Sequence, residues 1–101
     1  MKMIVVTLVD QNREEVLKIF KDAEVERFSG HDIAGYRENG EPLMLESWFP
    51  SQKGGTDSEL FFAFIQAEQV TRLFGRLAQF NRSKGGEHPV HAVEIPVERF
   101  L

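Results

Sequence analysis

Two segments of the chain are apolar at both alternating sets of positions, and they constrain the fold most strongly. Residues 2–9 read Lys-Met-Ile-Val-Val-Thr-Leu-Val, and residues 59–66 read Glu-Leu-Phe-Phe-Ala-Phe-Ile-Gln. In an extended strand successive side chains point to opposite faces, so both faces of these two segments must be covered. The pattern predicts that they are the two central strands of one sheet.

Two other segments have apolar residues at helical spacing. The first runs to about residue 24, and Asn12 stands three residues before Glu15, which is a variant of the capping box. Its apolar positions are Val16, Ile19, Phe20 and Ala23. The second has the clearest stripe, at Val70, Leu73, Phe74, Leu77 and Ala78. We expect this helix to end near residues 81–85, where asparagine and glycine can adopt a left-handed cap.

Three weaker strands complete the pattern. Residues 27–37 contain Gly30 and Gly35, which suggest bends or close approach of the backbone. Asn39-Gly40 is typical of a tight hairpin and leads into an alternating segment over 42–49, followed by a polar, glycine-rich loop. Residues 89–97 form the last strand, with His91, Val93, Ile95 and Val97 on one face.

The order βαββαβ predicts an α+β fold, a ferredoxin-like sandwich with a long ribbon-like insertion between strands 2 and 3. We interpret residues 1–101 as one domain, with an excursion over 36–58, because 101 residues leave no room for a second core. Both helices cover one face of the sheet. The other face is apolar too, so we expect a homo-oligomer that packs sheet against sheet.

Composition excludes several classes of site and partner. The chain has 12 basic and 16 acidic residues, a net charge of −4 and no cysteine, so disulfides, thiolate metal sites and cysteine nucleophiles are excluded. The acidic balance argues against nucleic acid. The apolar segment near the N-terminus is too brief for a signal peptide or membrane insertion, so we expect a cytoplasmic protein. The net negative charge is not spread evenly along the chain. The segment from Val70 to Gly86 carries four cationic side chains and no carboxylate.

Four short stretches carry a resemblance. Met1-Lys2-Met3-Ile4 opens the first strand, and Ile33-Ala34-Gly35-Tyr36 leads out of the second. Trp48-Phe49-Pro50 is soon followed by Lys53, and Arg82-Ser83-Lys84-Gly85-Gly86 precedes the last strand. In their order along the chain these stretches resemble the PII-like trimeric signalling proteins: the second and third resemble the roots of that family's T-loop, and the fourth its glycine-rich B-loop.

The resemblance implies a homotrimer with three clefts between subunits, each able to hold an adenine nucleotide, and an excursion that touches a protein partner. The candidate ligand-binding residues are Gly35, Arg37, Arg82, Lys84, Gly85 and Gly86. The candidate partner-binding residues are Leu43, Met44, Leu45 and Trp48. Residues 53–58 look longer than in the family, and the loop tip has no tyrosine for uridylylation.

The residues themselves leave a simpler explanation of the turn open. Glycine lets backbone N–H groups approach phosphate oxygens, and Arg82 and Lys84 supply positive charge. Equally, basic residues at a helix C-terminus complement the helix dipole, and glycine is an ordinary cap. The sequence does not separate these two readings.

Other constellations are weaker. His88 and His91 stand three apart in an expected strand and so point to opposite faces, and we assign no metal site.

Common nucleophile and phosphate-loop motifs of enzymes do not occur. We therefore predict a non-enzymatic regulatory or sensor protein. The alternatives are a small enzyme built on a dimeric α+β barrel, and a protein-docking scaffold that binds no small ligand.

Overall fold

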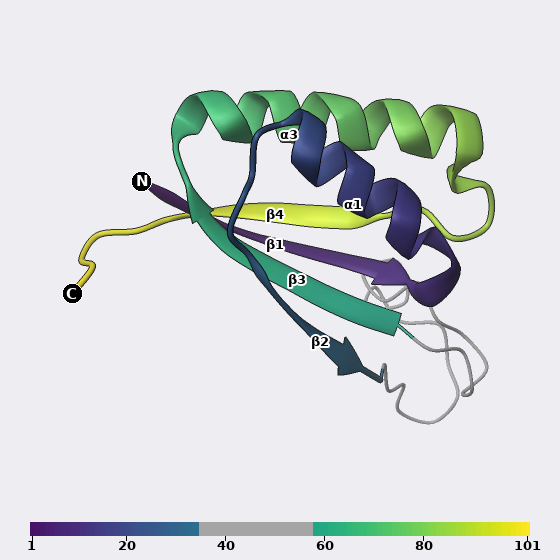
Figure 1. Cartoon of the computed structure of the whole chain (residues 1–101), viewed down its shortest axis with the longest axis horizontal. Coiled ribbons are helices and arrows are strands. Elements are labelled where there is room, and N and C mark those ends of the chain that lie inside the picture. The colour runs from purple at the N-terminus through teal and green to yellow at the C-terminus, as the bar shows by residue number, and fades with distance from the viewer. Residues whose placement is uncertain (35–57) are drawn as a thin grey trace.

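The structure is a computed structural model that describes residues 1–34 and 58–101 (Figure 1). The elements follow in the order β1 (Lys2–Val9), η1 (Asp10–Asn12), α1 (Arg13–Asp22), β2 (Ser29–Ile33), β3 (Ser58–Ile65), α3 (Ala67–Phe80), η3 (Asn81–Gly85) and β4 (His91–Pro96). The predicted hairpin at residues 39–40 and the predicted strand over 42–49 lie outside the described residues. The βαββαβ order of the remaining elements is confirmed.

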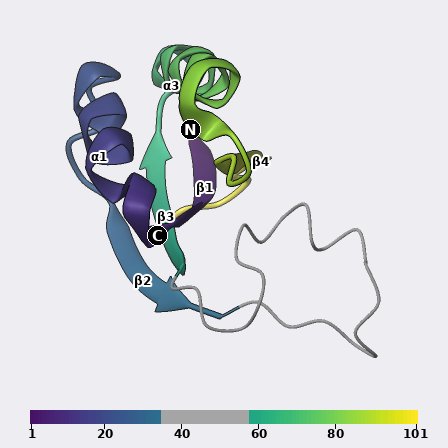
Figure 2. The same ribbon diagram turned by 90° about the vertical axis from the view of Figure 1, so that its right-hand side faces the viewer.

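The described strands form one antiparallel sheet in the order β2-β3-β1-β4. The two strands that are apolar on both sides, β1 and β3, are the central pair, as their patterns predicted. In the register Val5 lies opposite Phe62 on one side and opposite Val93 on the other. Both helices lie on the same face of the sheet, α1 towards β2 and α3 towards β4 (Figure 2).

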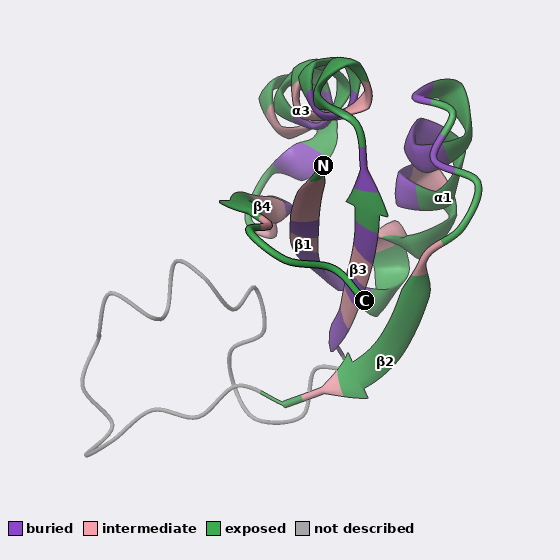
Figure 3. Cartoon of the chain, turned by 90° about the vertical axis from the view of Figure 1, so that its left-hand side faces the viewer, coloured by how far each residue is buried: buried purple, intermediate pink, exposed green. Residues whose placement is uncertain are grey.

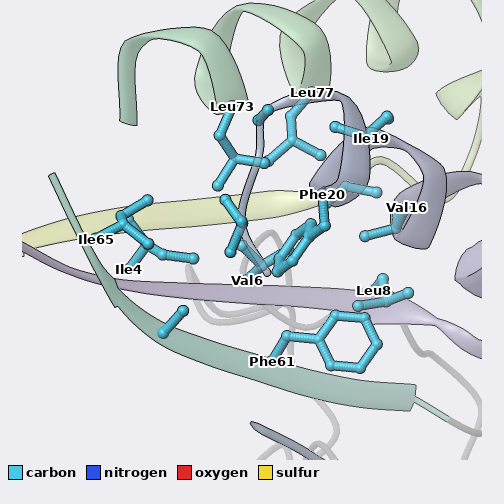
Figure 4. Packing of buried hydrophobic residues seen from close by; sticks show 14 of the residues in the cluster. Ile4, Val6, Leu8, Val16, Ile19, Phe20, Phe61, Ile65, Leu73 and Leu77 are labelled. Atoms are coloured by element: carbon cyan, nitrogen blue, oxygen red, sulfur yellow. The ribbon is translucent and has the colours of Figure 1, made fainter. Parts of the chain in front are cut away.

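The core lies between this face and the helices (Figure 4). Ile4, Val6 and Leu8 of β1 are fully buried there. The ring of Phe20 from α1 meets that of Phe61 from β3 edge to face, with centroids 5.6 Å apart. Full burial of each such side chain contributes about 1.5–3 kcal/mol, so the packing of the helices on the sheet stabilises the fold.

Gly30 of β2 fits the predicted close approach. It lies opposite Phe61, and a Cβ built at Gly30 would lie 2.7 Å from the ring of Phe61. This edge strand begins later than predicted, at Ser29 rather than at Arg27.

The predicted cap of the first helix is wrong. Asn12 does stand at the N-cap of α1, but its side chain makes no capping hydrogen bond. Its Nδ2 instead donates to the carbonyl oxygen of His88, at 3.0 Å. The turn η1 has already set the chain direction before α1, so the amide is used to join two distant segments.

The ends of α3 also differ from the prediction. A reciprocal capping box between Gln66 and Gln69 starts the helix. At the other end the chain continues as one π-helical turn over Asn81–Gly85, and the left-handed cap predicted there is wrong. The positive φ, 52°, comes one residue later, at Gly86. Both termini of α3 therefore depend on side-chain amides, which its apolar stripe does not reveal.

Candidate functional site

The turn after α3 is the described part of the predicted ligand site. Gly86 has φ 52° and ψ −125°, the values of the first central residue of a type II′ turn. The backbone N–H of His88 closes this turn by donating to the carbonyl oxygen of Gly85, at 2.8 Å. The turn geometry alone therefore requires glycine at position 86.

Asn81 holds the turn against the sheet. Its Nδ2 donates to the carbonyl oxygen of Val90, and its Oδ1 accepts from the backbone N–H of Val90, both at 2.8 Å. Gly85 is buried beside it, and a Cβ there would lie 3.1 Å from Oδ1 of Asn81. Since Asn12 also donates to His88, the turn is fixed from both sides. A fixed backbone is what a preorganised anion site needs. The same fixed backbone also joins α3 to β4, whether or not an anion binds.

The cations of this region face carboxylates on and just after α1. Lys84 Nζ lies 3.0 Å from Glu15 Oε2, and Arg76 lies 3.3 Å from Asp22 Oδ2. Arg72 lies 3.5 Å from Glu24, the residue that follows the helix C-cap. These are exposed pairs, so each contributes at most about 1 kcal/mol. Within residues 1–34 and 58–101, Arg82 is the cation of the turn that has no ion pair, and it is exposed.

The structure brings four of the predicted ligand residues together in one turn: Arg82, Lys84, Gly85 and Gly86. The other two, Gly35 and Arg37, lie outside the described residues. The same holds for all four predicted partner-binding residues: Leu43, Met44, Leu45 and Trp48. The excursion predicted over 36–58 overlaps the described chain only at Ser58, which is the first residue of β3.

A second polar cluster was missed by sequence reasoning. Glu59 of β3 is 3% exposed and pairs with the guanidinium of Arg13 at the start of α1. Arg13 also lies 3.9 Å from Asp10. Arg13, Glu59 and Asp32 line a depression of about 450 Å³ beside β2, whose other walls are Leu17, Gly30, His31 and Phe61.

Burial raises the pKa of Glu59, and a hydrogen bond shared with Asp10 raises it further, while Arg13 opposes both effects. The alternation of side chains along β3 was the signal in the sequence that could have found Glu59. Glu59 lies opposite Leu8, on the side of β3 that faces the helices. A carboxyl in that position must be buried with a partner, and α1 supplies the partner.

The face of the sheet turned away from the helices carries exposed apolar residues, among them Phe64, Val93 and Ile95. We call it the helix-free face. Its residues, from the register of the four strands, are Met3, Val5, Thr7, Val9, Ser29, His31, Ile33, Ser58, Leu60, Phe62, Phe64, His91, Val93 and Ile95. Thr7, Val9 and Ser58 are buried. Phe64 and Ile95, near the other end, are each 42% exposed.

The C-terminal tail reaches the exposed end of this face. The ring of Phe100 lies 5.4 Å from that of Phe64, yet Phe100 is itself 63% exposed. The tail leaves β4 and runs past the end of the sheet where β1 begins (Figure 1), towards the side of β3 (Figure 3). Solvent-exposed aromatic groups that gather on one face are typical of an interaction surface.

The similarity of this chain to known proteins lies in its fold. No family model matches the chain, and no curated protein matches it. Among solved structures, a DUF3240 family protein from Shewanella baltica OS155 is similar, with a TM-score of 0.65 and 15% identity over 98% of this chain and 91% of that one.

Two similar structures are of CPII, a nitrogen regulatory PII-like protein from Thiomonas intermedia K12. The first, bound to ADP, AMP and bicarbonate, has a TM-score of 0.60 and 16% identity over 99% of this chain and 94% of that one. The second, bound to ADP and bicarbonate, has a TM-score of 0.61 and 17% identity over 97% and 88%. The chain is therefore an α+β protein with a ferredoxin-like sheet. Within that class its fold is the PII-like fold, which confirms the resemblance.

Among the residues that the structure describes, no helix is long and apolar enough to cross a membrane. Across the same residues, histidine and carboxylate side chains do not gather into a group of three that could hold a metal ion.

Proposed function

We propose that this chain is a non-enzymatic regulatory protein of PII-like type that acts in the cytoplasm as a homotrimer and binds a small anionic ligand between subunits. The proposal takes residues 1–101 as one domain. It assigns the protein partner to the segment over 36–58, through Leu43, Met44, Leu45 and Trp48.

The helix-free face carries the proposal. A monomer with this fold leaves Phe64, Val93 and Ile95 between 37% and 42% exposed on one face of its sheet. Covering them with other copies removes apolar surface from water, at roughly 25 cal/mol for each Å². In a cyclic trimer the same patch is used three times, and clefts are formed between neighbouring subunits.

The turn after α3 is the proposed ligand contact. CPII, which has the same fold, is bound to ADP in both structures, and in one of them also to AMP. In this chain the turn offers a fixed backbone, glycine at two positions and the cations Arg82 and Lys84. A nucleotide phosphate is the anion that suits backbone N–H groups and a guanidinium together. Gly35 and Arg37 would complete the cleft.

Sedimentation velocity tests the assembly. We expect a species of three copies at micromolar concentration. A monomer would contradict the proposal, and a dimer with an enclosed apolar cavity would favour the alternative of an α+β-barrel enzyme.

Isothermal titration calorimetry with ATP, ADP and AMP tests the ligand. We expect binding that Arg82→Gln weakens roughly 10-fold or more, because it removes a charge-assisted hydrogen bond of about 1.5–3 kcal/mol. Arg72→Gln is the matched control, since Arg72 lies ten residues earlier, about 15 Å along the helix. Absence of heat with all three nucleotides would leave a trimeric docking scaffold as the better reading.

A further inference from the structure

The two cations of the turn after α3 differ in what they contact. Lys84 Nζ donates a hydrogen bond to Oε2 of Glu15, in the first turn of α1, at 3.0 Å. Arg82 has no ion pair within residues 1–34 and 58–101. An anion that approaches this turn therefore meets one cation that is available and one that is held by a carboxylate of another helix.

The side chain of Lys84 can change partner while the backbone of the turn stays in place. Asn81 fixes that backbone through two hydrogen bonds to Val90, each 2.8 Å long. A lysine side chain is a flexible four-carbon stem that ends in three rotatable donors. A change of rotamer is therefore enough to take the ammonium group from Glu15 to another anion beside the turn.

The pair of Glu15 with Lys84 is exposed, so an incoming anion can open it. The side chain of Lys84 is 61% exposed and that of Glu15 is 44% exposed. Water screens such a pair, which makes it weak. A phosphate group carries more negative charge than a carboxylate and has three acceptor oxygens, so it competes well for the ammonium group. The ligand still binds less tightly than it would to a lysine that is always available.

The surroundings of this pair identify Glu15 as the carboxylate that matters. Glu15 and Lys84 line a hollow of about 250 Å³ between α1 and α3, and the other charged residues of its wall are Lys18, Asp22 and Arg76. Asp22 pairs with Arg76, at 3.3 Å. Of the two carboxylates of this hollow, Glu15 is therefore the one that holds Lys84.

We propose that Glu15 sets the affinity of the turn after α3 for a phosphate group, by holding Lys84 in an ion pair that the ligand must open. The inference rests on the proposed function, because it deepens the ligand contact assigned there. Arg82 supplies a positive charge at all times, and Lys84 supplies one only when it leaves Glu15. Since Lys84 cannot hold both anions, the bound phosphate and the contact with α1 weaken one another by the same factor.

Isothermal titration calorimetry with ADP tests this role. Glu15→Gln should tighten the binding of ADP about threefold to fivefold, because an amide of similar size no longer holds the ammonium group by its charge. Lys84→Gln should weaken the binding. The double variant E15Q/K84Q should bind ADP as Lys84→Gln does, since the effect of Glu15 passes through Lys84. Circular dichroism verifies that each variant is folded.

Asp22→Asn is the matched control, because it removes the same charge from the same helix while the partner of Asp22 is Arg76. Asp22 lies about 10 Å along the helix from Glu15. This variant should change the affinity for ADP by less than about twofold, the part that charge alone contributes at this distance.

Three results would overturn the inference. They are equal affinities of the wild type and Glu15→Gln, equal gains in Glu15→Gln and Asp22→Asn, and a gain from Glu15→Gln that persists in full when Lys84 is replaced by glutamine. No heat from the wild type or from Glu15→Gln with ATP, ADP or AMP would instead overturn the nucleotide ligand of the proposed function, on which the role of Glu15 depends.

Discussion

Among the glycines of residues 1–34 and 58–101, Gly86 is the one with a positive φ, so its backbone conformation requires glycine. Its φ of 52° with ψ of −125° is a conformation that residues with a Cβ rarely adopt. We expect Gly86→Ala to lower the free energy of unfolding by about 1–3 kcal/mol, the usual range for such backbone strain. Equilibrium unfolding in urea, monitored by circular dichroism, measures this change.

Gly75 offers the matched control for that substitution. It lies inside α3, and a Cβ there would meet no atom within 4 Å. Gly75→Ala should therefore raise the free energy of unfolding by up to about 1 kcal/mol, because alanine favours the helix. Equal effects from the two substitutions would show that the II′ turn does not require glycine.

Glu59 predicts a pH dependence of stability. Because burial and Asp10 raise its pKa, the folded protein holds this proton more tightly than the unfolded chain does. The stability that this group contributes is fully present below its unfolded pKa, about 4.3, and is lost as the pH rises through the higher folded pKa. The free energy of unfolding of the wild type minus that of Glu59→Gln should fall over this window.

Urea unfolding at several values between pH 4 and pH 7 measures the difference. Asp10→Asn should reduce the fall, because it removes the second cause of the raised pKa. A difference that stays constant or rises with pH would mean that Arg13 outweighs burial and holds Glu59 ionised.

Among the elements, the junction of α3 with β4 depends on one side chain. Asn81→Ala removes two hydrogen bonds to the backbone of Val90. The N–H and the carbonyl oxygen of Val90 then lose these partners. We expect a loss of about 2–4 kcal/mol in the free energy of unfolding, about 1 kcal/mol for each bond and more for the orphaned groups. Hydrogen exchange at the amide of Val90 should become faster.

Ser83→Ala is the control for this junction. Ser83 lies in the same π-helical turn, but its exposed hydroxyl only donates to the carbonyl oxygen of Gln79. Its loss should change the stability by less than about 0.5 kcal/mol. If both variants behaved alike, the amide of Asn81 would not be what fixes the turn.

The elements also show where sequence reasoning succeeds. The central strands were predictable because burial on two faces leaves an unbroken apolar pattern, and α3 because its stripe repeats over three turns. The hydrogen bond from Asn12 to His88, the π-helical turn and the pair of Glu59 with Arg13 were not predictable. Each depends on a polar group finding a partner far along the chain: Asn12 bonds to a residue 76 positions away, and Arg13 to one 46 positions away.

The candidate site was predictable to a smaller extent. Basic residues and glycines marked the turn after α3, where Arg82, Lys84, Gly85 and Gly86 are neighbours along the chain. That this turn binds a ligand stays a prediction. The carboxylates that face its neighbouring cations come from α1 and from Glu24, which only the packing of the two helices reveals. Which residues of the four strands lie side by side depends on strand register, which a single sequence does not specify in a four-stranded sheet.

For the molecule as a whole, a charge placed on the helix-free face should separate the copies without unfolding them. Phe64 is suited to this test because it is 42% exposed in the single chain and lies at the exposed end of a central strand. Phe64→Asp should raise the dissociation constant of the assembly at least about 100-fold, as expected when an interface loses an aromatic anchor and gains a buried charge. Sedimentation velocity measures the assembly, and circular dichroism verifies the fold.

Leu17→Asp is the matched control, because Leu17 is also exposed, at 36%, but lies on α1 on the opposite side of the sheet. It should leave the assembly intact. Dissociation by both variants would indicate a general effect of added negative charge on an already acidic chain, and dissociation by Leu17→Asp alone would move the interface to the helices. Only loss of assembly in Phe64→Asp, with the fold retained and Leu17→Asp unaffected, assigns the interface to the sheet, because the two substitutions add the same charge to opposite faces.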